Sequence, residues 1–272
     1  MKPHKLLALC GVLLLLASAH ACNKLKARDN LNKGVRAFSN SQYQQAVEHF
    51  KLAVQLDPQL LNARLYLATA YQQQYIPGGE SPANRKIGED AIAAFGDVLK
   101  QDTSNVDAVS RIGRLYFDMK NFDKAKEYQQ RRIQLTPQNP EPYYWIGVIN
   151  WAIAYPRAQD LRRQLNIMSP KDPMRPDVLP PIPDKERAQL EEQNKGLVTE
   201  GIQALEKTVE LKPNDDAAMA YINLLYRQMA EFEPAGPERD ANLKTADDWV
   251  DRALNAKKSA GAASAASSTP SQ

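Results

Sequence analysis

The sequence predicts an all-α solenoid, in which helical hairpins stack into one right-handed superhelix. The first observation is a helical skeleton that recurs along the chain, with "AVEHFKLAVQLDPQ" at residue 46 and related segments at residues 91, 125 and 201. Each copy begins with a small residue and carries an apolar residue eight positions later, which in the first two copies follows another apolar residue. A residue that ends the helix stands twelve positions on. The second observation is composition: helix-favouring residues dominate, and there are only 12 glycines.

Composition and charge narrow the class of function. The chain has 272 residues, of which 43% are hydrophobic and 25% charged, so it is long enough for one large domain or an array of repeats. The formal net charge is only +3. Because nucleic-acid binding depends on a strong basic surface, we expect no nucleic-acid partner.

Residues 1–21 have the layout of a secretory signal peptide. A basic start, "MKPHK", precedes the twelve-residue apolar run "LLALCGVLLLLA" and small residues at Ala19 and Ala21. The run is too short to span a bilayer comfortably, which takes about 20 residues. Cleavage after Ala21 would leave 33 basic and 32 acidic residues, so the mature chain would be nearly neutral.

Cleavage would make Cys22 the first residue and the single cysteine of the mature chain, which excludes an internal disulfide. A lone cysteine at this point resembles the bacterial lipoprotein signal, although "AHAC" lacks the usual leucine. The resemblance implies lipidation of Cys22, with residues 22–26 as a short tether to an outer membrane, facing the periplasm. Two alternatives stay open: ordinary cleavage, which gives a soluble periplasmic or secreted protein with a free thiol, or an uncleaved anchor.

The recurrent skeleton fits a 34-residue unit. In a unit that starts at residue 27, Gly34 stands at position 8, Ala46 at position 20 and Pro58 at position 32; Gly113, Ala125 and Pro137 repeat this from residue 106. These residues resemble the tetratricopeptide repeat, a pair of antiparallel helices. Residues without bulk at positions 8 and 20 allow the helices to approach closely, and proline at position 32 ends the second helix.

The resemblance covers residues 27–256 as five repeats, three of them with insertions. The expected boundaries are 27–60, 61–105, 106–139, 140–215 and 216–256. The residues expected to pack the helices together are Gly34, Ala46, Phe50, Pro58, Ala68, Ala91, Phe95, Gly113, Tyr116, Ala125, Pro137, Gly147, Gly201, Pro213 and Ala246.

The spacing of the small residues locates the insertions. Repeats two and five each hold eleven extra residues, which we expect to lengthen both helices. In repeat four we expect a further helix over 154–168, starting near Pro156, and one long helix over 185–211. Residues 169–184 hold six prolines and are either a stiff crossover or a segment that docks on a partner. The Ala- and Ser-rich tail, 257–272, is expected to be disordered.

Catalysis is not expected, and neither is a cofactor or metal. The mature chain has one histidine, His49, with no nucleophile marked beside it, and one cysteine cannot form a zinc site with it. Carboxylates lie among lysines at helical spacing, which is typical of a solvated face.

The resemblance implies a groove formed by the first helix of each repeat. Arginines beside aromatic residues in it would suit an extended peptide. An alternative is that Tyr144, Trp145 and Trp151 belong to the core. Capture of a chaperone C-terminus is not supported, because the expected lysine and asparagine are absent. The candidate groove residues are Leu31, Phe38, Asn62, Leu65, Tyr66, Gln72, Arg111, Arg114, Phe117, Tyr144, Trp145, Trp151, Tyr221 and Gln228.

The favoured interpretation is a non-catalytic, lipid-anchored scaffold that binds other proteins or peptides in the cell envelope. One alternative is a structural subunit of an outer-membrane or pilus assembly machine, in which the convex face and the insertions make the contacts. The other is the regulatory arm of an envelope enzyme. A fold of this kind does not itself decide among them.

Overall fold

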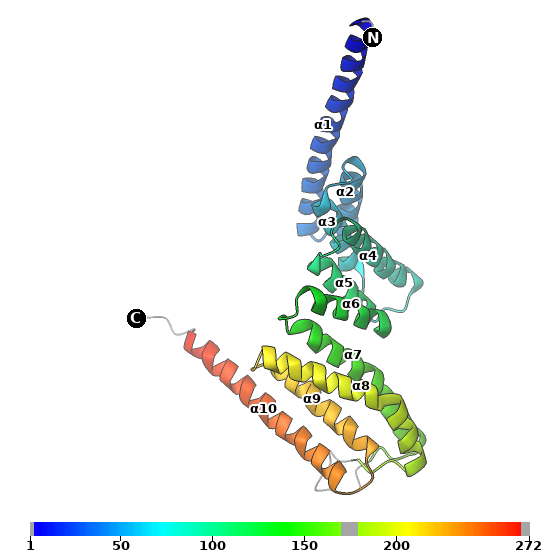
Figure 1. Ribbon diagram of the computed structural model, residues 1–272, viewed down its shortest axis with the longest axis vertical. Helices are drawn as coiled ribbons and strands as arrows, with labels where there is room; N and C mark the ends of the chain where they lie inside the picture. Colours follow the sequence, from blue (N-terminus) through cyan, green and yellow to red (C-terminus); the bar gives the residue numbers. More distant parts are fainter. Residues whose placement is uncertain (1–2, 170–178, 268–272) are drawn as a thin grey trace. The chain divides into compact units, whose positions relative to one another are not determined.

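The computed structural model describes residues 3–169 and 179–267, with side chains over residues 21–169 and 179–259. Its elements are consecutive helices, and the described residues contain no strand (Figure 1). The helices are α1 (Pro3–Ser39), α2 (Tyr43–Leu56), α3 (Leu61–Gln74), α4 (Pro82–Gln101), α5 (Val106–Asp118), α6 (Phe122–Leu135), α7 (Glu141–Gln164), α8 (Asp184–Leu211), α9 (Asp216–Met229) and α10 (Pro237–Ser267), with the 3-10 turn η1 (Ala230–Phe232) before α10. The prediction of an all-α fold built from sequential helical hairpins is confirmed.

The chain forms two compact units, residues 1–128 and 129–272. In the first unit, α1 packs on α2 and α3 on α4. Gly34 explains the closeness of the first pair, because a Cβ added there would lie 2.5 Å from the ring of Phe50, which is fully buried. Ala46 and Ala53 are also fully buried on α2. A proline follows the helix end at position 58, where it cannot continue the helix.

The second unit is held by a larger apolar core. In it α7 packs on α8, α8 on α9 and α9 on α10. Leu205 and Leu225 are fully buried at the centre of this core. Gly147 and Gly201 let the helices approach, because a Cβ at either position would meet one of these leucines at less than 3 Å. Repeated small residues thus mark close helix contacts in both units.

The extra residues of repeats two and five lengthen only the second helix of each hairpin. The first helices, α3 and α9, have 14 residues each, whereas α4 has 20 and α10 has 31. The expectation that both helices lengthen was therefore wrong. The sequence supplies the reason for α3, because Pro77 and Gly78 follow its end and Gly78 has a φ of +77°.

The insertion of repeat four also differs from expectation. The structure has no separate helix over 154–168, because α7 runs unbroken from Glu141 to Gln164 with Pro156 inside it. Pro156 lies on the exposed side, where the carbonyl group left without its helical donor can be hydrated. The long helix expected over 185–211 is confirmed as α8. Of the proline-rich stretch 169–184, residues 170–178 lie outside the described part.

The two ends of the repeat array are helical beyond the expected limits. Residues 22–26, expected as a tether, lie within α1. The tail expected to be disordered from residue 257 continues α10 as far as Ser267, in keeping with the high helix propensity of alanine, and residues 268–272 lie outside the described part. Among the described helices, none combines the length and the apolar character needed to cross a bilayer.

Candidate peptide-binding surface

Five aromatic rings form a continuous row on α7 and α9 of the second unit, which we call the aromatic ladder. Its members, in order of contact, are Trp145, Tyr144, Tyr221, Trp151 and Tyr155. The successive ring centroids are 5.7, 5.8, 5.4 and 5.0 Å apart. The first three contacts are edge-to-face and the last is stacked, and both geometries are favoured for aromatic pairs.

Helical spacing brings the ladder together. Tyr144, Trp151 and Tyr155 follow one another at intervals of seven and four residues, which places them on one side of α7. Tyr221 supplies the bridging ring from α9 and contacts both Tyr144 and Trp151. The ladder therefore depends on the packing of α7 against α9.

The ladder is partly open to solvent. Tyr144, Trp151 and Tyr221 are half-buried and pack on the core of the second unit, whereas Tyr155 is 38% exposed. Packing of Tyr144 and Trp151 on the core agrees with the core reading of these residues, and the groove reading stays a prediction. Tyr144, Trp151 and Tyr221 are anchored on the core by one side, so these rings have little rotamer entropy left to lose on binding.

Two polar groups of the same helices lack hydrogen-bond partners among the described residues. The indole Nε1 of Trp151 is buried and unpaired, and so are both amide atoms of Gln228. Gln228 is 5% exposed and stands two helical turns after Tyr221 on α9. A buried polar group without a partner costs about 1–3 kcal/mol. A ligand or ordered water that supplied the missing bonds would recover that free energy.

In the first unit, the structure brings Arg111 and Gln72 together. Arg111 Nη1 donates to Gln72 Oε1 at 2.8 Å, and its Nε donates to both carboxylate oxygens of Asp107 at 2.9 Å. Arg114 Nε is paired in the same way with Asp118, at 2.9 and 3.1 Å. Both arginines are thus already neutralised, and a peptide carboxylate would have to compete with an aspartate of the same helix.

The other candidates of the first unit do not form a comparable row. Leu31 and Phe38 are half-buried against its core. Tyr66 stacks on Phe50, with ring centroids 5.4 Å apart, and Phe117 meets Phe122 edge-on at 5.7 Å. The remaining two candidates are Asn62, which is exposed, and Leu65, which is half-buried.

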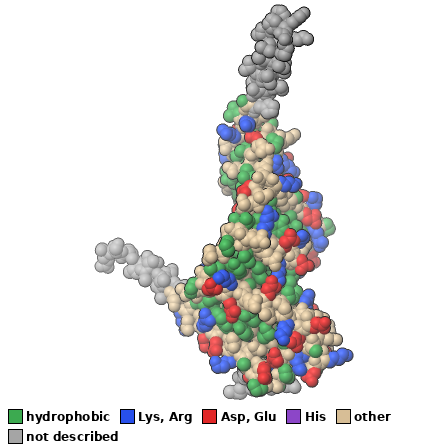
Figure 2. All heavy atoms as spheres, viewed as in Figure 1, with side chains coloured by type: hydrophobic (Ala, Val, Ile, Leu, Met, Phe, Trp, Pro, Cys, Tyr) green, Lys and Arg blue, Asp and Glu red, His purple; other side chains and the backbone are tan. Residues whose placement is uncertain are grey.

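The cysteine and the histidine of the described side chains, Cys22 and His49, do not belong to the aromatic ladder. Cys22 is exposed and forms no disulfide, and His49 Nδ1 lies 3.4 Å from Asn30 Oδ1. Within the described residues, no group of three histidine, cysteine, aspartate or glutamate side chains could hold a metal ion. Charges of both signs are interspersed over the visible face in Figure 2, in line with the small net charge.

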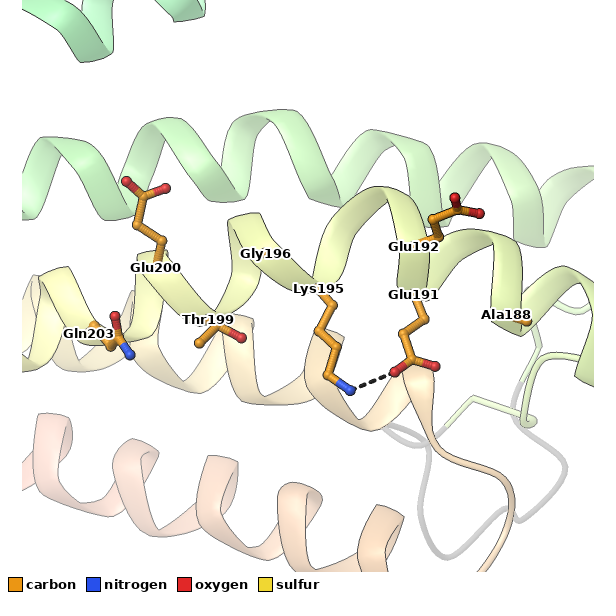
Figure 3. Close-up of a pocket in the computed structure, with 8 residues that line it drawn as sticks. All are labelled: Ala188, Glu191, Glu192, Lys195, Gly196, Thr199, Glu200 and Gln203. Atoms are coloured by element: carbon orange, nitrogen blue, oxygen red, sulfur yellow. Dashed lines mark hydrogen bonds and ion pairs between the residues drawn. The ribbon is translucent and has the colours of Figure 1, made fainter.

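A hollow of about 730 Å³ lies along one face of α8 and is a second candidate site (Figure 3). It is lined by residues of that helix alone, and its charges are partly satisfied, since Lys195 Nζ donates to Glu191 Oε1 at 2.5 Å. Glu200 points away toward α7, where it accepts a hydrogen bond from Asn150 at 3.0 Å. One helix face with paired charges is a weaker candidate than a row of rings from two helices.

Sequence reasoning missed Tyr155. The expectation of a new helix at residue 154 separated it from Trp151, whereas the continuous α7 puts it one turn further along the same side. The spacing of the two rings, four residues, was the signal that could have identified it.

Comparison with known proteins agrees with this architecture. The sequence profile of the tetratricopeptide repeat matches residues 88–146. The fold resembles that of a crystal structure of the MamA protein, at a TM-score of 0.55 and 17% identity over 86% of this chain and 92% of the other. MamA from Desulfovibrio magneticus gives a TM-score of 0.54 at 15% identity, over 86% and 96% of the two chains.

YrrB, described as a tetratricopeptide-repeat protein with an unusual peptide-binding site, gives a TM-score of 0.51 at 17% identity, over 89% of this chain and 97% of the other. Hsp70-Hsp90 organizing protein 3 from Arabidopsis thaliana is 30% identical over 115 residues, or 42% of this chain. The chain spans 19% of the length of that relative. The profile thus identifies a tetratricopeptide repeat at residues 88–146, and the stacked helical hairpins of the described residues resemble the folds of these solved structures.

Proposed function

We propose that this chain is a non-catalytic scaffold that binds an extended peptide segment of another protein along the aromatic ladder. The observation that carries the proposal is a row of five rings, three of which pack on the core, that is still partly accessible. Rigid aromatic side chains dominate the binding energy of protein interfaces, because they give large contact area at small entropic cost. The peptide-binding site described for YrrB, a protein of similar fold, supports the same class of ligand.

The unpaired polar groups of Trp151 and Gln228 suit a peptide rather than a purely apolar ligand. The indole nitrogen donates a hydrogen bond, and the glutamine amide both donates and accepts. A peptide backbone offers the complementary carbonyl and N–H groups at every residue. Because these atoms are buried, a peptide on the row of rings reaches them only when a neighbouring side chain moves, and the hydrogen bonds gained then fix its register.

The test is a binding experiment with peptides selected on the purified chain from a random display library. Tyr155→Ala should weaken binding about tenfold, or roughly 1.4 kcal/mol, because the ring is an exposed end of the ladder. Tyr66→Ala is the matched control, since Tyr66 has nearly the same exposure, 40% against 38%, and lies in the first unit. Equal losses in the two variants would place binding elsewhere than on the ladder, and failure to select any peptide would contradict the scaffold function.

We propose further that the scaffold is exported and anchored by lipid on Cys22, facing the periplasm. The signal-like layout of residues 1–21 and the exposed thiol of Cys22 support this location. Several acyl chains would hold the protein durably on a membrane, whereas one chain alone binds marginally.

Mass spectrometry of the mature N-terminus should find Cys22 as the first residue, carrying lipid. Cys22→Ser should move the protein from the membrane fraction to the soluble fraction without changing its helical content. An unmodified thiol on Cys22 in the wild type would exclude the anchor, and an intact residue 1 would exclude cleavage as well. Neither result would bear on peptide binding by the ladder.

A further inference from the structure

A cavity of about 780 Å³ lies in the first unit, at the point where repeat two carries its extra residues. Its walls are the loop between α3 and α4, the first turns of α4, and the turn between α5 and α6. Ligand pockets have volumes of about 300–1,000 Å³. The residues of α4 that line it lie between Arg85 and Ala93 of this 20-residue helix.

The loop wall of this cavity is fixed by one buried side chain. Asn84, 6% exposed, accepts a hydrogen bond from the N–H of Ile76 at 2.8 Å and donates to the carbonyls of Ile76 at 2.8 Å and Gly79 at 2.9 Å. Gly79 has to be glycine here, since its Cβ would lie 2.7 Å from the Asn84 amide nitrogen. A wall held in this way needs little ordering when a ligand binds.

The floor of the cavity is apolar and aromatic. Tyr75 and Met119 pack against Gly88, where a Cβ would lie 3.1 Å from the ring of the first and from the sulfur of the second. Tyr116 and Ile92 complete the lining on this side. Such a floor suits an apolar or aromatic side chain.

The rim carries two cations and two anions that are not used by the fold. Arg85, Lys120, Glu80 and Glu89 line the cavity, and within the described part of the chain none of their side chains makes a hydrogen bond or an ion pair. Asp118 also lines the cavity, but its carboxylate is already paired, because Arg114 Nε donates to its Oδ1 at 2.9 Å. The unused charges of the rim therefore balance, with equal numbers of each sign.

We propose that this cavity binds a short peptide with free termini and an apolar side chain. Arg85 and Lys120 bind its carboxylate, Glu80 and Glu89 bind its ammonium group, and the side chain lies against the aromatic floor. A ligand with only one kind of charge would meet an equal number of like charges, which binding sites use to reject wrong ligands. A neutral ligand would cover the four charges without pairing them, which is unfavourable.

The probes are the dipeptides Ala-Leu, Leu-Phe and Ala-Tyr, titrated into the full chain by calorimetry. At least one should bind saturably, and N-acetylation or C-terminal amidation of that dipeptide should each weaken binding about tenfold, the loss of one charge-assisted contact. Arg85→Gln should lower the affinity for the unblocked dipeptide by a similar factor. In this variant, amidation of the dipeptide should lower the affinity little further, because the carboxylate has already lost its partner. Glu89→Gln should likewise lower the affinity for the unblocked dipeptide, and N-acetylation should then lower it little further.

Arg36→Gln is the matched control, because Arg36 is an exposed arginine of α1 outside the cavity. It should leave the affinity unchanged, and circular dichroism should show that every variant keeps its helical content. No saturable binding of any dipeptide, equal binding of the blocked forms, or an unchanged affinity in Arg85→Gln would overturn the proposal. Tyr155→Ala should not alter dipeptide binding, so this test and that of the aromatic ladder fail independently.

Discussion

Replacing Gly147 by alanine is expected to destabilise the second unit by about 2 kcal/mol, although alanine favours a helix over glycine by about 1 kcal/mol. The added Cβ would lie 2.3 Å from Cγ of Leu205 and within 2.8 Å of both its terminal carbons. Leu205 is fully buried in the core, so a shift of its side chain would disturb the close-packed residues around it. Overpacking costs about 1–3 kcal/mol and sometimes more, which exceeds the gain in helix propensity.

Urea unfolding followed by tryptophan fluorescence measures this effect. All three tryptophans, at positions 145, 151 and 249, lie in the second unit, so the signal reports on that unit. Gly196→Ala is the matched control: its Cβ meets no atom within 4 Å, and it should stabilise α8 by about 1 kcal/mol.

The pair Gly147→Ala and Leu205→Ala tests the cause. Leu205→Ala alone should cost about 2–5 kcal/mol through the cavity that it leaves. In the double variant the new methyl group occupies part of that space, so the total loss should be smaller than the sum of the single losses. If Gly147→Ala raised the urea midpoint of unfolding, as Gly196→Ala should, the contact between position 147 and Leu205 would not be tight.

The close helix contacts were predictable because the repeat marks them. Small residues recur at fixed positions of the repeat. Because glycine does not favour a helix, its recurrence there indicates that a neighbouring helix packs closely against it. The sequence could not say which atom approaches: Gly34 meets a phenylalanine ring and Gly147 a leucine. Those partners depend on how successive hairpins rotate against one another, and residue spacing alone does not determine that rotation.

The aromatic ladder was predictable only in part, because its completeness depends on the length of α7. A proline inside a helix costs about 3 kcal/mol, so Pro156 favoured a new helix start in the sequence. In the structure it lies on the exposed side of α7, and the packing of Ala154 and Ala158 on the core continues the helix past it. Tertiary packing thus outweighed local preference, and it brought Tyr155 onto the ladder.

Two of the buried arginines of the second unit, Arg162 and Arg239, were not predictable. In the stretch "QDLRRQ" Arg162 looks like part of a solvated face. It is fully buried, as is most of Arg239, whose Nη1 donates to the carbonyl of Ala230 at 2.9 Å and whose Nη2 donates to that of Leu179 at 2.7 Å. Each arginine has a partner far away in sequence, since Glu231 is 69 residues from Arg162 and Leu179 is 60 residues from Arg239, and no local pattern marks these contacts.

Replacing Arg162 by methionine is expected to lower the free energy of unfolding by about 3–5 kcal/mol, which is more than the loss expected for Gly147→Ala. Arg162 Nε donates to Glu231 at 2.9 Å, Nη2 forms a second bond to the same carboxylate, and Nη1 donates to the carbonyls of Pro180 at 2.9 Å and Ile167 at 3.3 Å. The guanidinium thus connects the chain at Ile167 and at Pro180 to Glu231 of η1. The variant removes the cation that bonds to the largely buried carboxylate of Glu231 and leaves Arg239 as the remaining cation that acts on it.

The loss should depend on pH in a direction set by Glu231. Burial raises the pKa of Glu231, and the neighbouring Arg162 opposes that rise. Without Arg162 the pKa rises further above the unfolded value of 4.5, so the folded variant binds the proton more tightly than the unfolded chain. Its stability should therefore increase as the pH falls from 7 toward 4.5, and the deficit against the wild type should narrow.

The double variant Arg162→Met with Glu231→Leu separates the charge from the shape. Replacing a buried ion pair by apolar residues of similar volume is often nearly neutral, whereas removing one partner is not. The double variant should thus recover much of the lost stability at pH 7, and its deficit should not narrow on acidification. If the double variant were as unstable as the single one, or if the deficit of the single variant were the same at pH 7 and pH 5, the stability would come from the carbonyl contacts of Arg162 and not from its pairing with Glu231.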